Sequence, residues 1–430
     1  SYYEQGRRAG FFSLTVRPSW RFFKDFIILR GFMDGYYGYT VSMNSALEVF
    51  LKYAKLRDLY TRENRIGKET ICFINSQGYW GGGEKWHFDI ISSMNSHQYR
   101  FIYISSHASP LSQKLADLNV DGYQISISNR SFLNPFKVMK LARIFRDEKV
   151  GVLLTNLSND MKVASIAGKL AGVPNIIYRR GTAIPVRNSI LNRYFFRRVI
   201  TRIIANSQET KRSILENNSL LVPEDKIKMI YNGVILSSYH RDVKPLYKAE
   251  EGEIVLGSAG RLSEEKGHLY LLDMMNHLKK DKLRYKLLIA GEGKMLHTLE
   301  KKVQKLDISD QVKFLGFVED MPSFFRSIDI FVLSSQFEGF GYVITEAMAS
   351  RKPVVAFDIK SSAEIVEHGE TGYITRSNDI DDMAARVNEL AADSELRDKM
   401  GEKGRMRVKE LFSFEKSQKE VVELFNLQAD

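Results

Sequence analysis

The sequence predicts an α/β protein in which two Rossmann-like, doubly wound parallel-sheet domains face each other across a cleft, preceded by an N-terminal helical extension. Strand-like and helix-like segments alternate along most of the 430 residues, as they do in proteins with parallel sheets. A polar linker at about residues 236–252 divides the alternation into two series. Glycine-containing loops follow several strands, and ligands bind parallel sheets at the carboxyl ends of their strands.

The composition indicates a globular, cytoplasmic protein. Hydrophobic residues make up 44% and charged residues 27% of the chain, which are ordinary values. The longest apolar run, residues 22–33, is too short to cross a bilayer and contains three charged side chains. The single cysteine, Cys72, excludes a disulfide framework and a cysteine zinc site. The chain begins with Ser1 rather than Met, so we expect it to be part of a longer polypeptide.

Residues 1–66 form an extension of unusual composition. They include eleven basic and six acidic residues, and aromatic side chains crowd the first forty positions. Helices are expected at residues 18–31 and 42–60, with a turn at 31–35 between them. Such a basic, aromatic hairpin suits the interface of an anionic membrane. It equally suits packing against the following domain.

The first predicted domain spans residues 68–238. It begins with a strand at 70–74, a glycine-rich loop at 77–84 and a helix that ends near residue 94, a unit that binds nucleotides in many α/β proteins. No acidic residue ends the next strand, so a dinucleotide cofactor is not expected. Later strands are predicted at 100–105, 122–127, 152–155, 175–178, 202–205 and 228–230, with helices at 112–118, 135–148, 161–171, 188–198 and 208–217.

One span of this domain is strongly basic. Residues 161–208 contain nine lysines and arginines and no acidic side chain. Such a surface attracts phosphates or anionic lipid. No nucleic-acid recognition motif is present, so we expect no nucleic-acid partner.

The second predicted domain spans residues 251–412. Its strands are predicted at 254–258, 285–290, 312–316, 328–333, 353–357 and 372–374, and its helices at 268–279, 294–305, 321–326, 342–350 and 380–392. A last helix within residues 413–430 is expected to return to the first domain.

Two motifs of the second domain suggest a ligand site. The loop Gly260-Arg-Leu-Ser-Glu-Glu-Lys-Gly267 projects the cations Arg261 and Lys266, which suit a diphosphate leaving group, although a solvated basic loop has the same composition. The segment at 331–350 is a strand, a glycine loop and a helix carrying Glu338 and Glu346. Helix N-termini attract anions and carboxylates accept hydrogen bonds from hydroxyls, so this pair suits a sugar and a ribose beside a phosphate. Glu364 is expected to cap a helix rather than to contact the ligand, although both roles are open.

In this order, the motifs resemble those of the family 4 retaining glycosyltransferases of the GT-B fold. The similar segments, over about residues 69–430, are Gly81-Gly-Gly-Glu84, Ala205-Asn-Ser207, Tyr231-Asn-Gly-Val234, Gly260-Arg-Leu with Lys266-Gly267, Ile289-Ala-Gly-Glu-Gly293, Val312-Lys-Phe-Leu-Gly316, Glu338-Gly-Phe-Gly341 with Glu346-Ala, Glu364-Ile-Val and Thr371-Gly372. Residues 1–66 resemble the C-terminal tail of family 2 glycosyltransferases of lipopolysaccharide core synthesis, through Arg17-Pro-Ser-Trp-Arg-Phe-Phe-Lys-Asp-Phe, Gly31-Phe-Met-Asp-Gly35 and Phe50-Leu-Lys-Tyr-Ala-Lys. The chain would then be the second half of a tandem enzyme.

The resemblance implies roles for individual residues. Arg261 and Lys266 would hold the diphosphate of a nucleotide-sugar donor, Glu338 would contact the donor sugar, and Glu346 would bind the ribose. The leaving phosphate oxygen would take the acceptor proton, so neither a metal nor a cofactor is expected besides the donor. Further donor contacts are assigned to Gly260, Gly293, Phe317, Val318, Gly339, Phe340 and Gly341.

The acceptor side departs from the family pattern. Many members carry a histidine near the strand at 175–178, whereas this chain continues as Tyr178-Arg-Arg-Gly-Thr-Ala. Two replacements are expected as alternatives: Arg179 or Arg180 substitutes for the histidine electrostatically, or Asn159 and Asp160 take a positioning role. The glycines assigned to this side are Gly81, Gly82 and Gly83.

We therefore expect a hexosyl transfer from a nucleotide-diphosphate sugar to a glycan or glycolipid acceptor, in bacterial cell-surface polysaccharide or lipopolysaccharide synthesis. The basic span and the aromatic extension favour a peripheral position on the inner face of the cytoplasmic membrane. Two alternatives stay open: a nucleotide-sugar epimerase on the same fold, and a non-catalytic membrane-binding module.

Overall fold

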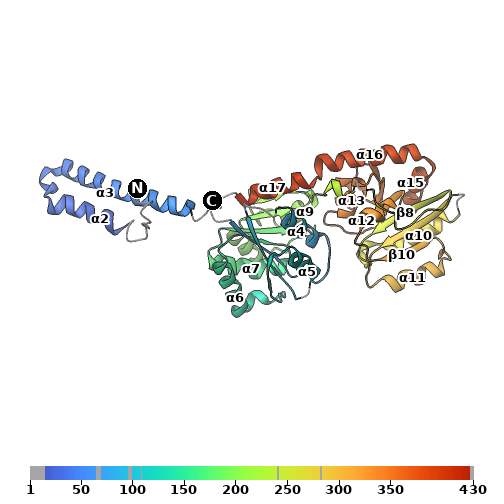
Figure 1. Ribbon diagram of the computed structural model, residues 1–430, viewed down its shortest axis with the longest axis horizontal. Coiled ribbons are helices and arrows are strands. Elements are labelled where there is room, and N and C mark those ends of the chain that lie inside the picture. Colours follow the sequence, from blue (N-terminus) through green and yellow to red (C-terminus); the bar gives the residue numbers. More distant parts are fainter. Residues whose placement is uncertain are drawn as a thin grey trace. The chain divides into compact units, whose positions relative to one another are not determined.

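The computed structural model describes residues 15–63, 69–94, 99–107, 109–239, 242–280 and 283–426. Contacts divide these residues into two units (Figure 1). Residues 15–63, with the strand residues 69–70 and 99–100, form a helical unit, and the other described residues form an α/β unit. Among the helices of the described ranges, none is long and apolar enough to cross a bilayer.

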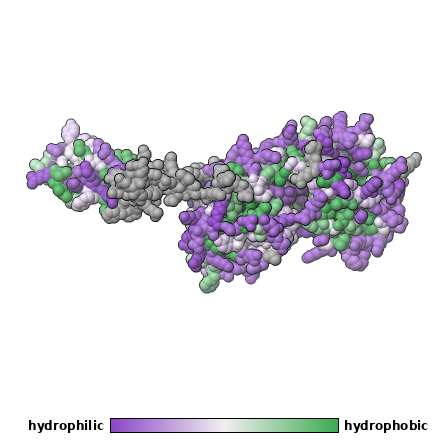
Figure 2. Space-filling model, in the orientation of Figure 1, coloured by the Kyte–Doolittle hydropathy of each residue, from purple (hydrophilic) through white to green (hydrophobic). Residues whose placement is uncertain are grey.

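The helical unit is a hairpin that both packs and exposes aromatic side chains. α2 (Val16–Phe23) continues into a π-helical turn (Lys24–Ile28), and a 3-10 turn (Gly31–Asp34) leads to α3 (Gly35–Glu63), which begins earlier than predicted. Phe22, Phe26 and Tyr39 pack together with ring centroids 5.3 to 5.9 Å apart. Hydrophobic residues also lie on the surface of this unit (Figure 2), among them Trp20, Phe32, Met33, Tyr36 and Tyr37.

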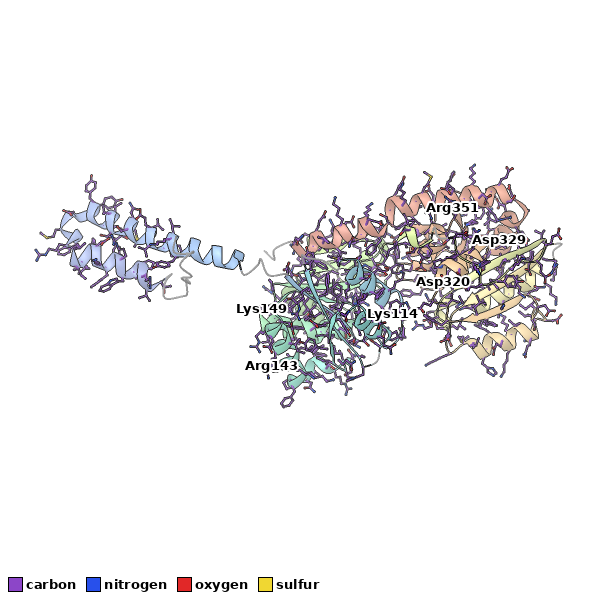
Figure 3. All side chains as sticks on the ribbon, in the orientation of Figure 1. Lys114, Arg143, Lys149, Asp320, Asp329 and Arg351 are labelled. Atoms are coloured by element: carbon purple, nitrogen blue, oxygen red, sulfur yellow. The ribbon has the colours of Figure 1, made fainter. Side chains whose placement is uncertain are left out.

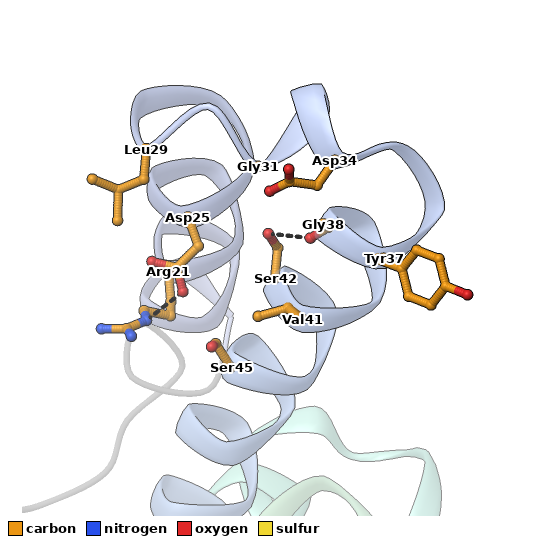
Figure 4. Close-up of a pocket in the computed structure, with 10 residues that line it drawn as sticks. All are labelled: Arg21, Asp25, Leu29, Gly31, Asp34, Tyr37, Gly38, Val41, Ser42 and Ser45. Atoms are coloured by element: carbon orange, nitrogen blue, oxygen red, sulfur yellow. Dashed lines mark hydrogen bonds and ion pairs between the residues drawn. The ribbon is translucent and has the colours of Figure 1, made fainter.

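A pocket of about 660 Å³ lies beside the turn of the hairpin (Figure 4). Its lining includes an ion pair between Arg21 Nε and Asp25 Oδ2, 2.8 Å apart, and the hydroxyl of Ser42, which donates to the carbonyl of Gly38 at 2.8 Å. Charged, polar and apolar groups all line it, so the pocket favours no single ligand chemistry.

The first sheet of the α/β unit has seven strands in the order β3-β2-β1-β4-β5-β6-β7. The strands are β1 (Glu69–Asn75), β2 (Tyr99–Ser105), β3 (Asp121–Gln124), β4 (Val150–Thr155), β5 (Asn175–Arg180), β6 (Arg202–Ala205) and β7 (Ile227–Met229). The helices are α4 (Gly82–Ser93), α5 (Pro110–Asp117), α6 (Pro135–Asp147), α7 (Ser158–Ala171), α8 (Ile190–Tyr194), extended by a π-helical turn (Phe195–Val199), and α9 (Gln208–Leu215). The strand order reverses between β1 and β4, which makes the loops after these strands the switch point of the sheet.

The second sheet has six parallel strands in the order β10-β9-β8-β11-β12-β13. The strands are β8 (Glu253–Ala259), β9 (Arg284–Ala290), β10 (Val312–Gly316), β11 (Ile330–Leu333), β12 (Val354–Phe357) and β13 (Gly372–Thr375). The helices are α10 (His268–Leu278), α11 (Leu296–Lys305), α12 (Met321–Arg326), α13 (Tyr342–Ala349), α14 (Ser361–Ile365), α15 (Ile380–Ala392), α16 (Ser394–Leu411) and α17 (Phe414–Asn426). The switch point lies between β8 and β11.

The inner strands of both sheets are buried on their two faces. β5 and β12 are buried at every position, as expected of strands covered by helices on both sides, and the second sheet separates two apolar clusters. Short 3-10 turns occur at Ser131–Leu133, Glu224–Lys226, Leu236–Tyr239 and Glu264–Lys266. The prediction of two parallel-sheet α/β domains is therefore confirmed.

Two chain segments pass between the domains and pair with each other. Val234 forms a β-bridge with Ser413, and its N–H donates to the carbonyl of Phe412 at 2.9 Å. Beyond this crossing, α17 contacts the first domain, because the amide of Gln418 donates to the hydroxyl of Ser93, at the end of α4, at 3.1 Å. The pairing fixes where the two domains are joined.

Candidate active site

The switch point of the second sheet brings a cation and a carboxylate of the predicted site together. Lys266 follows β8 and Glu338 follows β11, and the Lys266 Nζ and Glu338 Oε1 atoms lie 2.5 Å apart. The Ser335 hydroxyl donates to the same carboxylate oxygen at 2.9 Å. The side chains of the pair are only 20% and 12% exposed. The sequence places these residues far apart, and the topology of the sheet joins them.

Glycine at position 267 is needed for this proximity. Gly267 adopts a φ of 65°, and a Cβ atom there would lie 2.1 Å from the carbonyl oxygen of Ser334, so another residue would clash. The Ser334 hydroxyl donates to the Gly267 carbonyl at 2.8 Å. The two loops are therefore held backbone against backbone.

Arg261, the second predicted cation, lies against the first domain. Its guanidinium carbon is 4.8 Å from the ring centroid of Tyr79, which belongs to the glycine-rich loop after β1. Its Nη2 atom donates to Glu265 at 2.7 Å, and nearly half of the side chain is exposed. Arg261 thus occupies the junction between the domains.

The loops after β8, β9 and β10 stack at one edge of the second sheet. The N–H of Gly260 donates to the carbonyl of Ala290 at 2.9 Å, and Gly293 lies against the segment that follows Gly260. Phe317 is 56% exposed, whereas Val318 is half-buried against the apolar core. The residues assigned to the nucleotide therefore share this edge.

The segment after Glu338 lies at the contact between the domains. A Cβ atom at Gly339 would lie 1.8 Å from the carbonyl oxygen of Gly181 in the first domain. The Ser207 hydroxyl donates to the Gly339 carbonyl at 3.0 Å. Phe340 is buried in an aromatic cluster, so any contact of this residue with a donor would involve its backbone. Gly341 precedes α13.

Glu346, on α13, is buried in a polar network. The hydroxyl of Tyr239 donates to its Oε1 atom at 2.8 Å, and the Nζ atom of Lys85, on α4, lies 4.0 Å from the same oxygen. Burial raises the pKa of Glu346, and the ammonium of Lys85 partly opposes this rise. Neither Lys85 nor Tyr239 belongs to a sequence motif, so neither was predicted to lie in the site.

The three glycines of the first domain lie at the start of α4. Gly81 precedes the helix, and a Cβ atom at Gly82 would lie 3.0 Å from the Tyr342 ring of the second domain. Gly83 lies against the side chain of Asn156, which follows β4. The loop therefore occupies both the switch point of the first sheet and the junction between the domains.

The arginines predicted to replace the family histidine are both buried. Arg179 donates from Nη1 to Asn156 and from Nη2 to Asn232, each at 2.7 Å, and lies 4.5 Å from the Trp86 ring centroid. Burial lowers its pKa to about 10. Arg180 donates to the carbonyl of Ile184. Arg179 is thus a fixed cation of the domain interior.

Asp160 lies at the first switch point without solvent exposure. Its Oδ2 atom accepts the N–H of Ser76 at 2.9 Å, and within the described part of the chain Oδ1 has no hydrogen-bond partner. Burial raises its pKa to about 6. With respect to the described residues, the carboxyl group therefore keeps a free acceptor next to the glycine-rich loop.

Two further contacts join the domains. Glu364 accepts the N–H groups of Gln208 and Glu209, both at 2.8 Å, and so caps α9 of the first domain. Lys114 pairs with Glu319, with Nζ and Oε1 2.5 Å apart; Figure 3 labels Lys114 and Asp320, the neighbour of Glu319. The predicted capping role of Glu364 is confirmed, although the capped helix belongs to the other domain.

Two family models match the chain. Residues 80–238 match the model described as "Glycosyltransferase Family 4", and residues 242–407 match "Glycosyl transferases group 1". Among the described residues, no group of three or more His, Cys, Asp or Glu side chains is arranged to hold a metal ion.

Two relatives of this chain are named as glycosyltransferases. The uncharacterized glycosyltransferase MJ1178 of Methanocaldococcus jannaschii is 32% identical over 260 residues, which cover 59% of this chain and 68% of that protein. The capsular polysaccharide biosynthesis glycosyltransferase CapM of Staphylococcus aureus is 26% identical over 67% of this chain and 80% of CapM.

Solved structures share the fold. Anabaena Alr3699/HepE in complex with UDP has a TM-score of 0.71 at 22% identity, over 82% of this chain and 98% of that one. The glycosyltransferase of Rickettsia africae ESF-5 has a TM-score of 0.74 at 20% identity, over 84% and 98%. The predicted GT-B fold is therefore confirmed.

Proposed function

The chain belongs to the glycosyltransferases of family 4, and from this we propose that it transfers a hexosyl group from a nucleotide-diphosphate sugar to a glycan or glycolipid, with retention of configuration. The observation that carries the proposal is the contact between Lys266 and Glu338 at the second switch point. A cation for the diphosphate and a carboxylate for the sugar hydroxyls lie together where parallel sheets bind ligands.

The donor would span the loops of the second domain. A diphosphate beside Lys266 competes with Glu338 for the ammonium group, and the released carboxylate then accepts hydrogen bonds from the sugar. Arg261 adds a second cation, and the N-terminus of α13 favours negative charge. The names of two structural neighbours, HepE with UDP and HepE with UDP-glucose, support a nucleotide-sugar donor.

Transfer would need neither a protein nucleophile nor a metal or other cofactor. The bond between the anomeric carbon and the phosphate oxygen breaks, and the acceptor oxygen bonds to the same face of that carbon. The acceptor proton moves to the leaving phosphate oxygen. Arg261 and Lys266 stabilise the negative charge that develops on the diphosphate.

A membrane-bound acceptor would agree with the charge distribution. Exposed cations of the span 161–208 lie on and around α8. These cations are Lys169, Arg187, Arg193, Arg197 and Arg198. The apolar side chain of Ile190, at the start of α8, is 86% exposed beside them. Basic and apolar side chains together favour an anionic lipid surface. The acceptor would then be a glycolipid at the inner face of the cytoplasmic membrane, used in cell-surface polysaccharide or lipopolysaccharide synthesis. The name of the relative CapM, a capsular polysaccharide biosynthesis glycosyltransferase, supports such a process.

Substitution of Glu338 tests the donor site. Glu338→Gln keeps the size of the side chain but removes the charge, and we expect transfer to fall about 100-fold or more, as when one stabilising group of an active site is lost. Glu367→Gln is the matched control, because Glu367 pairs with Arg407 at the surface. Product formation from labelled nucleotide sugars and a membrane extract is measured, with circular dichroism to verify folding.

Three results would reject the proposal. Full activity of the Glu338→Gln variant would show that Glu338 does not belong to the donor site. Conversion of the nucleotide sugar at an equal rate without any acceptor would indicate an epimerase. Membrane binding without affinity for any nucleotide sugar, measured by calorimetry, would indicate a non-catalytic module.

A further inference from the structure

A buried ionisable network joins α4 of the first domain to α13 of the second. The Nζ atom of Lys85 lies 2.9 Å from Asp89 Oδ2 and 4.0 Å from Glu346 Oε1. Tyr239 donates to the same Glu346 oxygen at 2.8 Å, and Lys85 lies 5.7 Å from the ring centroid of Tyr342. Asp89 and Glu346 are each only 6% exposed. The network therefore combines two carboxylates with one ammonium group.

Charge balance in this network depends on Lys85. Burial raises the pKa of Glu346 and of Asp89, and Lys85 opposes the rise at both. Burial also keeps the pKa of Tyr239 and Tyr342 well above the usual value, so both hydroxyls stay neutral. The guanidinium of Arg179, in the interior of the first domain, lowers the pKa of Tyr342 but does not outweigh burial. Without Lys85, two buried carboxylates would face each other, and one would take up a proton.

We infer that Lys85 is a positioning residue that keeps Glu346 ionised as the acceptor for the donor ribose. The inference rests on the proposed function, in which Glu346 binds ribose hydroxyls. An ionised carboxylate accepts hydrogen bonds roughly twice as strong as those of a neutral group, so protonation of Glu346 weakens the ribose contact.

The position of Lys85 links donor affinity to the contact between the domains. Lys85 belongs to α4 and Glu346 to α13, and Gly82, one turn before Lys85, lies against the Tyr342 ring. Separation of α4 from α13 would remove the ammonium group from Glu346. Donor binding and association of the two domains are then coupled, and each favours the other.

Calorimetry on the full chain tests the inference. UDP, GDP, ADP and CDP are titrated into the wild type, and the tightest is compared with its 2′-deoxy analogue. At pH 6.5 we expect Lys85→Met to weaken binding of the ribonucleotide about tenfold, because the ribose contact is a hydrogen bond to a charged group. Binding by this variant should recover toward pH 9 as Glu346 loses its proton, while wild-type binding changes little. The 2′-deoxy analogue should respond much less.

Two variants separate charge from packing. Asp89→Asn removes the competing carboxylate, so Lys85→Met/Asp89→Asn should regain most of the lost affinity. Asp89→Asn alone, which also serves if Lys85→Met does not fold, should bind at least as tightly as the wild type at pH 6.5. A loss that is equal at every pH, equal for the 2′-deoxy analogue, or unrelieved by Asp89→Asn would overturn the inference and leave the proposed function standing. A wild type that binds none of the four nucleotides would overturn both.

Discussion

Asp160 illustrates a residue whose ionised form the fold disfavours. Its pKa is raised from the usual 3.8 to about 6 by burial. A carboxyl group with a raised pKa adds stability below its ordinary pKa, and this contribution is lost as the pH rises through about 6. Among the described residues, the Oδ1 atom has no hydrogen-bond partner next to the glycine-rich loop, which is consistent with the positioning role predicted for Asp160 on the acceptor side.

We predict that Asp160→Asn stabilises the protein at high pH. Asparagine still offers an oxygen to the N–H of Ser76 but carries no charge, so at pH 8 the free energy of unfolding should rise by about 2–3 kcal/mol. The gain should shrink as the pH falls below about 6 and vanish toward about pH 3.5, where Asp160 is protonated in both the folded and the unfolded protein. Urea unfolding at both pH values measures the difference, and a variant less stable than the wild type at pH 8 would contradict the prediction.

The contacts of some single residues could be predicted from the sequence, and those of others could not. The proximity of Lys266 and Glu338 follows from the order of the strands, because both residues lie in loops that follow the two strands of a switch point. The contacts of Lys85 and Tyr239 with Glu346 depend on how two domains meet, and no local pattern encodes that. The burial of Arg179 was also missed, since the two asparagines that hold it lie after other strands.

At the scale of elements, α9 depends on a residue of the other domain. The carboxylate of Glu364 accepts two N–H groups at its N-terminus, and Lys360 pairs with Glu209 in the same turn at 3.0 Å. Hydrogen bonds to a charged group contribute about 1.5–3 kcal/mol each. The first turn of α9 therefore holds the two domains together.

We predict that Glu364→Ala loosens this turn. Loss of the cap should speed amide hydrogen exchange at residues 208–210 by about 10-fold or more, because a charged cap of about 1.5 kcal/mol is lost. The exchange of α6 should stay unchanged, which serves as an internal reference. Unaltered exchange at residues 208–210 in this variant would show that the cap does not stabilise the turn.

The sequence predicted most elements of the α/β unit but missed α16. Charged residues dominate this helix, and two glycines interrupt its pattern, so it lacks the apolar periodicity that identifies helices. The structure explains the glycines: a Cβ atom at Gly401 would lie 2.1 Å from the carbonyl oxygen of Arg351, and Gly404 contacts Met348. Close packing against α13, invisible in the sequence, replaces the apolar face.

At the scale of the α/β unit, the loops of both switch points meet. Arg261 contacts Tyr79, Gly339 contacts Gly181, and Glu346 lies near Lys85. Each of these contacts joins a residue assigned to the donor with a residue of the first domain. A ligand that binds between such loops stabilises their association, so the proposed donor would favour the arrangement seen here.

At the scale of the whole chain, the helical unit carries the membrane hypothesis. Trp20 is 58% exposed, and Tyr36 and Tyr37 are each 79% exposed. Aromatic side chains at a hairpin surface with basic neighbours insert into the headgroup region of a bilayer. The same side chains would also suit contact with another protein domain. Dependence on anionic lipid distinguishes the two cases, because only membrane binding requires it.

We predict that the full chain floats with vesicles that contain anionic lipid and not with neutral vesicles. Replacement of Trp20, Tyr36 and Tyr37 by serine should reduce flotation at least about tenfold, because burial of apolar area drives interfacial binding. Phe136→Ser is the matched control, since Phe136 is 84% exposed in the α/β unit. If the triple variant floats like the wild type, membrane binding must come from the basic surface around α8, and added salt would then abolish it in both proteins. If neither the wild type nor the triple variant floats with anionic vesicles, the membrane is excluded as a partner. A contact between the hairpin and another protein would then be favoured.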